Sequence, residues 1–317
     1  MSVEVRSLSA DDVDLWFELR GGPPAIGVLA KLRSQLSRGE LNPLLRLIAV
    51  SEGRIVAGLS ATRKYDELIS FSEPFYRQHL SPQLAQVCGD ALLEHLLTAT
   101  GQLTVPQSIL ETRPADDIPG VDSWLTSLQR HGFIEIACAH LYVRGLPLHA
   151  LSRDLSLSAD VHFLQYRADL FDVLVDLYAR SRTSTLDRRT AATMLNPRDY
   201  ISELQTIGDP GFSSDLWLVA VEHDVPFGFA LGAVRQDPMF KCRTGLVLEI
   251  GVVPEKRRRG FGRLLLTQAL PVLTEVGAER AVSLIDDANI ASLRTHQPLG
   301  FVPLPHRFMV YHKRLKD

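Results

Sequence analysis

The hydrophobic pattern of the second half of the chain alternates between strand and helix signals. An apolar run at 246–253 is followed by a basic, glycine-bearing turn and then by apolar residues at helical spacing. A short buried strand is predicted at 281–285, and a helix from about Ile290 ends at Gly300. Strands that alternate with helices indicate an α/β sheet. Upstream, the pattern predicts a strand at 161–166, helices at 169–181 and 196–207, and a hairpin over 218–228.

The basic turn after the first of these runs has the composition of a phosphate site. The first N–H groups of a helix have no partner within the helix, and the helix dipole places partial positive charge there, so an anion binds at that end. Gly260 and Gly262 lack a Cβ, which lets a pyrophosphate approach the backbone closely. The alternative is a basic, solvent-exposed turn, because Gly-x-Gly alone is weak evidence. Phosphate binding is favoured by the preceding Pro254 and by three consecutive arginines: Arg257, Arg258 and Arg259.

Residues 246–266 resemble motif A of the GCN5-related N-acetyltransferases, the GNAT superfamily, whose hallmark is Arg/Gln-x-x-Gly-x-Gly/Ala. In that family the loop holds the pyrophosphate of acetyl-CoA, and the preceding strand pairs with the pantetheine arm. The resemblance implies that backbone groups of Ile250 and Val252 hold the pantetheine. It also implies that backbone amides of the loop hold the pyrophosphate: Arg257, Arg258, Arg259, Gly260, Phe261 and Gly262. The sequence here fits neither a dinucleotide fingerprint nor a P-loop.

A second segment resembles the same family. The family pattern Asn-x-x-Ala-x-x-x-Tyr-x-x-x-Gly-Phe is matched at Asn289, Gly300 and Phe301, with a serine in the alanine place and His296 in the tyrosine place. The resemblance implies that Asn289 contacts CoA or caps the helix, and that residue 296 faces the CoA sulfur. An imidazolium at His296 can donate a proton to the departing thiolate. The alternative is a histidine on the helix surface, and Pro298 is expected to truncate that helix.

Glu249 is the best candidate for a general base. A substrate ammonium with a pKa of about 10.4 must lose a proton before it can attack a thioester. A carboxyl group inside an apolar strand is expected to have a raised pKa if it is buried. The alternative is that Glu249 reaches solvent or pairs with an arginine. Another position at which the family carries a glutamate is occupied by Leu284, and the expected role of Asp286 and Asp287 is helix capping.

The first half of the chain repeats the pattern of the second half at an offset of about 170 residues. Segments 47–50 and 55–58 form a hairpin pattern like that over 218–228, and Gly132-Phe133 precedes a strand as Gly300-Phe301 does. We therefore expect two similar domains, at 1–150 and 158–317. Aligning Pro82 with Pro254 places Cys88 and Asp90 at the two loop glycines, so the first domain is expected to lack the CoA pyrophosphate loop.

The composition of the chain points to no site but limits the classes of partner and location that we expect. Of 317 residues, 45% are hydrophobic and 22% are charged, as in soluble globular proteins. The net charge of −3 gives no reason to expect nucleic acid or a membrane surface as a partner. The N-terminal sequence has no signal-peptide pattern, and the longest apolar runs are of strand length. Three scattered cysteines form neither a metal-ligand spacing nor a disulfide framework, so we expect no metal and a cytoplasmic location.

These observations predict an α/β (α+β) protein with two GNAT-like acyl-CoA N-acyltransferase domains, each a mixed, mostly antiparallel sheet flanked by helices. We expect an acetyl-CoA-dependent N-acetyltransferase that moves an acetyl group to a primary amine of a small molecule or peptide by direct attack, as a monomer or homodimer. The alternative is a CoA-binding or interaction module without turnover, favoured by His296 and Leu284. A third hypothesis changes the acyl donor or acceptor, since tandem GNAT proteins include mycothiol synthase-like and N-myristoyltransferase-like enzymes.

Overall fold

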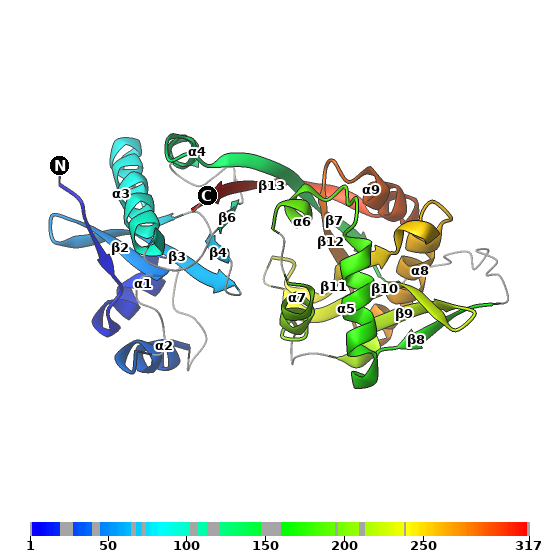
Figure 1. The fold of residues 1–317 in the computed structure, drawn as a ribbon. Helices are drawn as coiled ribbons and strands as arrows, with labels where there is room; N and C mark the ends of the chain where they lie inside the picture. The colour runs from blue at the N-terminus through cyan, green and yellow to red at the C-terminus, as the bar shows by residue number, and fades with distance from the viewer. Residues whose placement is uncertain are drawn as a thin grey trace. The chain divides into compact units, whose positions relative to one another are not determined.

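The chain forms two compact units, each of which is described by itself. The computed structural model describes residues 2–19, 28–39, 45–64, 68–71, 74–101, 107–112, 121–146, 160–193, 196–208, 213–237 and 239–315 (Figure 1). Unit 1 contains residues 1–136 and 308–317, and unit 2 contains residues 137–307. The domain boundary was expected between Gly145 and Asp160, and residues 147–159 of that stretch lie outside the described residues.

Unit 1 is a mixed sheet with helices. The strand order is β1-β2-β3-β4-β6-β13, with β5 paired to β3. The pair β4–β6 is parallel and the other pairs are antiparallel. The strands are β1 (Glu4–Ser7), β2 (Arg46–Ser51), β3 (Arg54–Lys64), β4 (Leu68–Phe71), β5 (Phe75–Tyr76), β6 (Gln107–Thr112) and the end of β13 (Val302–Arg314). The helices are η1 (Ala10–Asp12), α1 (Val13–Leu19), α2 (Val28–Ser37), α3 (Pro82–Gly101) and α4 (Val121–Arg130).

Unit 2 has a second mixed sheet, in the order β7-β12-β11-β10-β9-β8. Only β11 and β12 pair in parallel. The strands are β7 (Ile134–Gly145), β8 (Val161–Gln165), β9 (Trp217–Glu222), β10 (Val225–Asp237), β11 (Cys242–Val252) and β12 (Arg280–Asp286). The helices are η3 (Ala168–Leu170), α5 (Phe171–Ser181), α6 (Arg188–Thr193), α7 (Pro197–Leu204), η4 (Ser214–Leu216), η5 (Pro254–Lys256), α8 (Phe261–Glu275), α9 (Ile290–His296) and η6 (Gln297–Leu299).

The two units repeat one topology, and each sheet ends with a strand from the other half of the chain. In both units three antiparallel pairs are followed by a parallel pair and a final antiparallel pair. β7 ends the first half, yet residues 139–145 pair with β12 in unit 2. β13 ends the second half, and residues 309–314 pair with β6 in unit 1. The expected halves, 1–150 and 158–317, therefore differ from the compact units by these exchanged strands.

The helix starts follow local sequence signals. α3 begins directly at Pro82, and the preceding Ser81 accepts a hydrogen bond from the Leu84 amide at 3.2 Å. The alignment that placed Cys88 and Asp90 at the loop glycines was wrong, because both residues lie in the interior of α3. The start of α3 still differs from the basic loop of unit 2, since Ser81-Pro82 occupies it. A proline in a helix interior is expected to kink or shorten the helix, but α8 continues through Pro271 to Glu275.

Each unit has its own apolar core. In unit 2 the core joins α5, α7 and α8 to the sheet around fully buried aromatic residues such as Trp217, Phe229 and Phe301. In unit 1, Trp124 and Leu92 belong to the corresponding cluster between α3, α4 and the sheet. Over the described ranges, no helix is long and apolar enough to cross a membrane. Within the same ranges, no three His, Cys, Asp or Glu side chains are grouped to hold a metal ion.

Candidate active site

A β-bulge in β11 decides which way Glu249 points. Leu231 of β10 pairs with Glu249, but the next residue, Gly232, pairs with Val247, which leaves Leu248 as the extra residue. Before the bulge, Gly245 faces α8, because a Cβ added to it would lie 3.0 Å from the Leu273 side chain of that helix. After it, a Cβ on Gly251 would lie 2.9 Å from Ser181 Oγ of α5. Because alternate residues share a face, Glu249 lies on the α5 face of the sheet, where α5 and α7 are seen in front of the strands (Figure 1).

The same strand loses its parallel partner partway along. β11 and β12 pair at three positions only, the last of which joins Leu246 to Val282. β11 nevertheless continues to Val252 and β12 to Asp286. On their other side, Ile250 and Val252 pair with β10. Backbone polar groups require partners, so this stretch of β11 suits the amides of a pantetheine arm, the role predicted for Ile250 and Val252.

Glu249 lies in an environment that makes it a base near neutral pH. The Tyr200 hydroxyl of α7 donates a hydrogen bond to Glu249 Oε1 at 2.5 Å. Tyr200 in turn stacks on Tyr178 of α5, with 4.9 Å between ring centroids. Burial raises the pKa of Glu249 to about 7, against the lowering effects of the Tyr200 hydrogen bond and of Arg189 and Arg182. Burial and the nearby carboxylate raise the pKa of Tyr200 well above its ordinary value, so its hydroxyl stays a donor.

The loop between β11 and α8 presents a row of backbone amides. The first helical hydrogen bond runs from the Leu264 amide to the Gly260 carbonyl at 3.0 Å. Gly260 has φ +84° and Arg258 has φ +60°, both in the left-handed region. A Cβ at Gly260 would meet no atom within 4 Å, so the backbone conformation, not crowding, favours glycine there. Among the described residues, no acceptor is found for the amides of Arg258, Arg259, Gly260, Phe261, Gly262 and Arg263. This arrangement fits a diphosphate.

Arg257 has a structural role that differs from the one predicted for it. Its guanidinium donates to three backbone carbonyls: Val252 at 3.0 Å, Thr183 at 2.9 Å and Ser181 at 2.7 Å. Its amide donates to the Pro254 carbonyl at 3.2 Å. Arg257 therefore ties the end of β11 to the end of α5, and neither its side chain nor its amide is available to phosphate oxygens.

The other two loop arginines differ from each other. The Arg259 guanidinium lies 5.1 Å from the centre of the Phe261 ring and 3.8 Å from Glu222 Oε1. The other carboxylate oxygen of Glu222, Oε2, pairs with Lys256. Arg258 is exposed, and its guanidinium has no partner among the residues that the structure describes. Of the three arginines, Arg258 is therefore the one best placed to bind phosphate with its side chain.

Asn289 and His296 mark the two ends of α9. Asn289 Oδ1 accepts a hydrogen bond from the Ser292 amide at 3.1 Å, which confirms the predicted helix cap. Its contact with CoA stays a prediction. His296 is 3% exposed, and its Nδ1 lies 2.9 Å from the Ser292 carbonyl oxygen. A carbonyl only accepts, so Nδ1 carries the hydrogen and Nε2 is left as a buried acceptor without a partner in the described structure.

Burial also lowers the pKa of His296. The ring is therefore neutral at pH 7, with its single N–H directed to a helix carbonyl. This state is opposite to the one required of the predicted imidazolium donor. The edge of the ring packs against Phe301, with 5.0 Å between centroids, so a packing role for His296 accounts for its surroundings.

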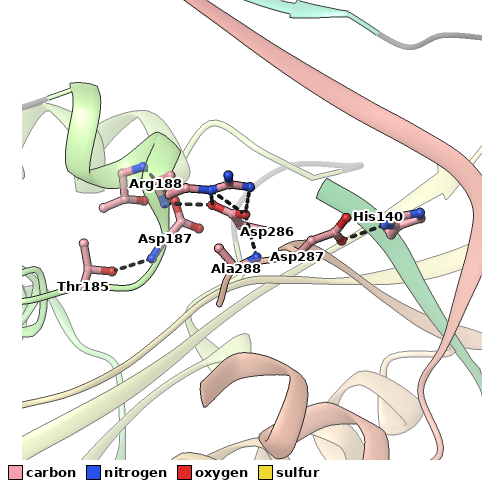
Figure 2. A network of polar contacts seen from close by, with 8 residues as sticks. His140, Thr185, Asp187, Arg188, Asp286, Asp287 and Ala288 are labelled. Atoms are coloured by element: carbon pink, nitrogen blue, oxygen red, sulfur yellow. Dashed lines mark hydrogen bonds and ion pairs between the residues drawn. The ribbon is translucent and has the colours of Figure 1, made fainter. Parts of the chain in front are cut away.

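A polar network surrounds the end of β12 (Figure 2). Asp286 accepts hydrogen bonds from the Arg188 guanidinium at 2.7 Å and from the Ala288 amide at 3.0 Å, and these interactions lower its pKa despite burial. Asp286 is therefore a poor base, and the capping role predicted for it was wrong, because Asn289 is the cap of α9. Asp287 instead faces β7, where its Oδ1 lies 2.7 Å from His140 Nδ1. Leu284, on the same strand, supplies no carboxylate.

Sequence reasoning missed Tyr200 and His140. Tyr200 falls within the helix that was predicted at 196–207, but no motif marks it. His140 was assigned to the first domain, whereas the exchange of β7 brings it to unit 2. No signal within the sequence of β7 tells which sheet this strand joins.

Comparison with known proteins agrees with this geometry. Residues 177–301 match the model of the acetyltransferase (GNAT) family. Mycothiol acetyltransferase of Thermobispora bispora is 39% identical over 57 residues, which cover 18% of this chain and only 19% of that relative.

Solved structures extend the likeness to the whole chain. A GCN5-related N-acetyltransferase from Sphaerobacter thermophilus has a TM-score of 0.66 at 15% identity, over 99% of this chain and 96% of that one. A tandem GNAT protein from the clavulanic acid biosynthesis pathway has a TM-score of 0.61 at 14% identity, over 100% of this chain and 99% of that one. At these identities the likeness concerns the fold. Residues 177–301 are thus similar to the GNAT acetyltransferase family, and the whole chain shares the fold of the tandem GNAT protein.

Proposed function

We propose that this protein transfers an acetyl group from acetyl-CoA to a primary amine, with the reaction taking place in unit 2. The observation that carries the proposal is Glu249, a desolvated carboxyl group with a pKa of about 7 on the strand that enters the amide-rich loop. A base of this pKa is partly ionised at neutral pH and still strong enough to accept a proton in the transition state.

The residues present fit acetyl-CoA in two places. The amides of residues 258–262, with the Arg258 side chain, would hold the diphosphate. The stretch of β11 beyond its last pair with β12, at Ile250 and the Val252 amide, would hold the pantetheine arm. The bound co-substrate supplies a thioester, an acyl group already activated for attack by an amine.

In this proposal the chain positions the amine and moves its protons. Glu249 removes a proton from the acceptor ammonium, directly or through a water, and Tyr200 keeps the carboxylate oriented. Positioning supplies much of the remaining rate enhancement, because holding two reactants together replaces a bimolecular encounter. Departure of the CoA thiolate calls for a proton donor, and His296 is in the wrong protonation state for that task.

The acceptor is proposed to be a small molecule that reaches Glu249 from the side of α5, α6 and α7. A surface pocket there is lined by Arg182 and by the hydroxyl-bearing residues Ser184, Thr185 and Thr190. Arg182 both lines this pocket and lowers the pKa of Glu249, which favours the pocket as the route to the base. The curated relative is named for mycothiol. Small polar amines are therefore the first acceptor class to test, before peptides.

The first test measures acetyl-CoA binding by isothermal titration calorimetry. A double variant with Gly260→Asp and Gly262→Asp puts carboxylates where phosphate is expected, and it should lose most of the affinity. Gly277→Asp is the matched control, because Gly277 also has positive φ (+85°) but lies beyond the far end of α8. It should bind as the wild type does. Equal binding by the double variant would refute the loop assignment.

The second candidate function is a CoA-binding module without turnover. Neutral His296 and apolar Leu284 favour it, since they stand where the family resemblance places a tyrosine and a glutamate. Release of free thiol from acetyl-CoA, followed against a panel of small amines, separates the two functions. Tight binding without any amine-stimulated thiol release would identify the module.

A further inference from the structure

Strand β7 brings three alternate side chains to the α9 face of unit 2. His140 contacts Asp287 just before α9, the Tyr142 hydroxyl bonds with Gln297 just after it, and Arg144 donates to the Leu299 carbonyl. All three belong to the first half of the chain by sequence and to unit 2 by structure. The first half therefore contributes side chains directly to the surroundings of α9.

His140 differs from the other two because it forms a histidine–carboxylate pair. Its Nδ1 lies 2.7 Å from Asp287 Oδ1, while the Asp287 amide donates to the Cys138 carbonyl at 2.8 Å. The carboxylate thus fixes Nδ1 as the hydrogen-bearing atom and leaves Nε2 to exchange a proton. The side chains of His140 and Asp287 are 22% and 40% exposed, so water can return a proton to the pair.

The strand register places His140 level with Glu249. The last β11–β12 pair joins Leu246 to Val282. Three residues further along, these strands reach Glu249 and Ile285, and Ile285 pairs with His140. Glu249 faces α5 and α7, whereas His140 shares the face of α9. A base and a second proton-transfer group thus lie at the same level of the sheet, on opposite faces.

We propose that His140, oriented by Asp287, is the proton donor to the sulfur of CoA, in place of His296. This inference rests on the proposed function. As the amine nitrogen bonds to the acetyl carbon it gives up one of its protons to water, and the carbon–sulfur bond breaks with its electron pair passing to sulfur. The proton on Nε2 of the imidazolium moves to that sulfur, giving the free thiol, and water then reprotonates His140.

Among the described residues, the charged and titratable groups around His140 come from the β12–α9 loop and from its own strand. Asp287 faces it from the β12–α9 loop, and Asp286 in that region is neutralised by Arg188 of α6. Cys138, Tyr142 and Arg144 flank it on its own strand. Burial and Asp287 raise the pKa of Tyr142, so its phenol holds its proton more firmly than an ordinary tyrosine does.

The kinetic test uses hydroxylamine as acceptor, because its nitrogen is already unprotonated at pH 7 and needs no base. His140→Gln should lower kcat by about 100-fold or more with little change in the KM for acetyl-CoA, and it should abolish the decline of kcat at high pH. Asp287→Asn should likewise lower kcat and weaken its decline at high pH. Tyr142→Phe and Arg144→Met remove the neighbouring β7–α9 contacts, so they should lower the melting temperature but leave the pH profile intact.

A second test, NMR of the histidine side chains, measures CoA binding near His140 and requires no catalysis. Imidazole NMR signals, assigned with His140→Gln, should shift for His140 when CoA is added, and they should shift less with an analogue that lacks the sulfur. Unchanged His140 signals, or a His140→Gln variant with wild-type kcat and pH profile, would overturn the proposal. A wild-type protein that binds CoA near His140 but releases no thiol would instead refute the proposed acetyltransferase activity.

Discussion

Replacing Glu249 with glutamine should separate its role in stability from its role in catalysis. Its pKa of about 7 in the folded protein compares with 4.5 for an ordinary glutamate. At about 1.4 kcal/mol per unit, the difference corresponds to roughly 3 kcal/mol. The folded state holds this proton more tightly, so the associated stability is present below pH 4.5 and is lost as the pH rises through 7.

Glutamine keeps an oxygen for the Tyr200 hydroxyl but does not titrate. Between pH 4 and pH 8 the wild type should therefore lose up to about 3 kcal/mol of unfolding free energy relative to Glu249→Gln. Urea denaturation of both proteins at the two pH values measures this difference. In kinetics, the acid limb of kcat near pH 7 should disappear in Glu249→Gln, with kcat at pH 7 reduced about 100-fold or more for an amine that is protonated there.

Tyr200→Phe is the matched variant, because it removes only the hydroxyl that stabilises the carboxylate. A hydrogen bond to a charged group contributes about 1.5–3 kcal/mol, so its loss should move the acid limb upward by about one to two pH units. An acid limb that stays near pH 7 in Glu249→Gln, or that moves downward in Tyr200→Phe, would refute the assignment of Glu249 as the base.

Three further predictions concern the loop, the exchanged strands and His296. Arg257→Gln should cost about 2–4 kcal/mol of stability in chemical denaturation through its lost backbone contacts, with a small effect on acetyl-CoA affinity. Arg258→Gln should weaken acetyl-CoA binding in calorimetry and leave the stability nearly unchanged. Fragment 160–317 expressed alone should fail to give a cooperative melt, because it lacks β7, and co-expression with fragment 1–146 should restore one. The stability of the wild type relative to His296→Leu should fall as the pH drops below 6.5. Burial lowers the pKa of His296 in the folded state, so the unfolded chain binds a proton more readily and the folded state loses relative stability. Thermal melts of both proteins at pH 7.5 and pH 5 check this.

Features fixed by neighbouring residues were predictable from the sequence. α9 begins at Ile290 as expected and is capped by Asn289, and it gives way to a 3-10 turn that contains Pro298. The strand, turn and helix around Gly260 also follow the local pattern, since only a few residues decide where a helix begins. The effect of Pro271 was not predictable in this way, because tertiary packing of α8 outweighs the loss of one backbone donor.

Features fixed by distant residues were not predictable. Simple alternation along β11 places Glu249 on the face of Gly245 and Val247, toward α8, and only the bulge at Leu248 turns it toward Tyr200. The bulge depends on the partner strand, which leaves no mark on β11 itself. Similarly, the sequence of β7 shows that it is a strand, but pairing with β12 rather than β6 is decided by the fold as a whole.

The exchange of strands bears on the role of the first half, which is predicted to lack a phosphate loop. A first domain that merely accompanied the second could be deleted without harm to the site. Deletion of the first half would remove β7 and leave the backbone of β12 without a partner on that side. It would also remove the contacts to Asp287, Gln297 and Leu299 that hold α9. Deletion of β13 would likewise leave β6 of unit 1 unpaired on that side. Since unpaired sheet edges are costly and prone to association, each half is required by the other. The first half is therefore necessary to the second without any phosphate loop of its own.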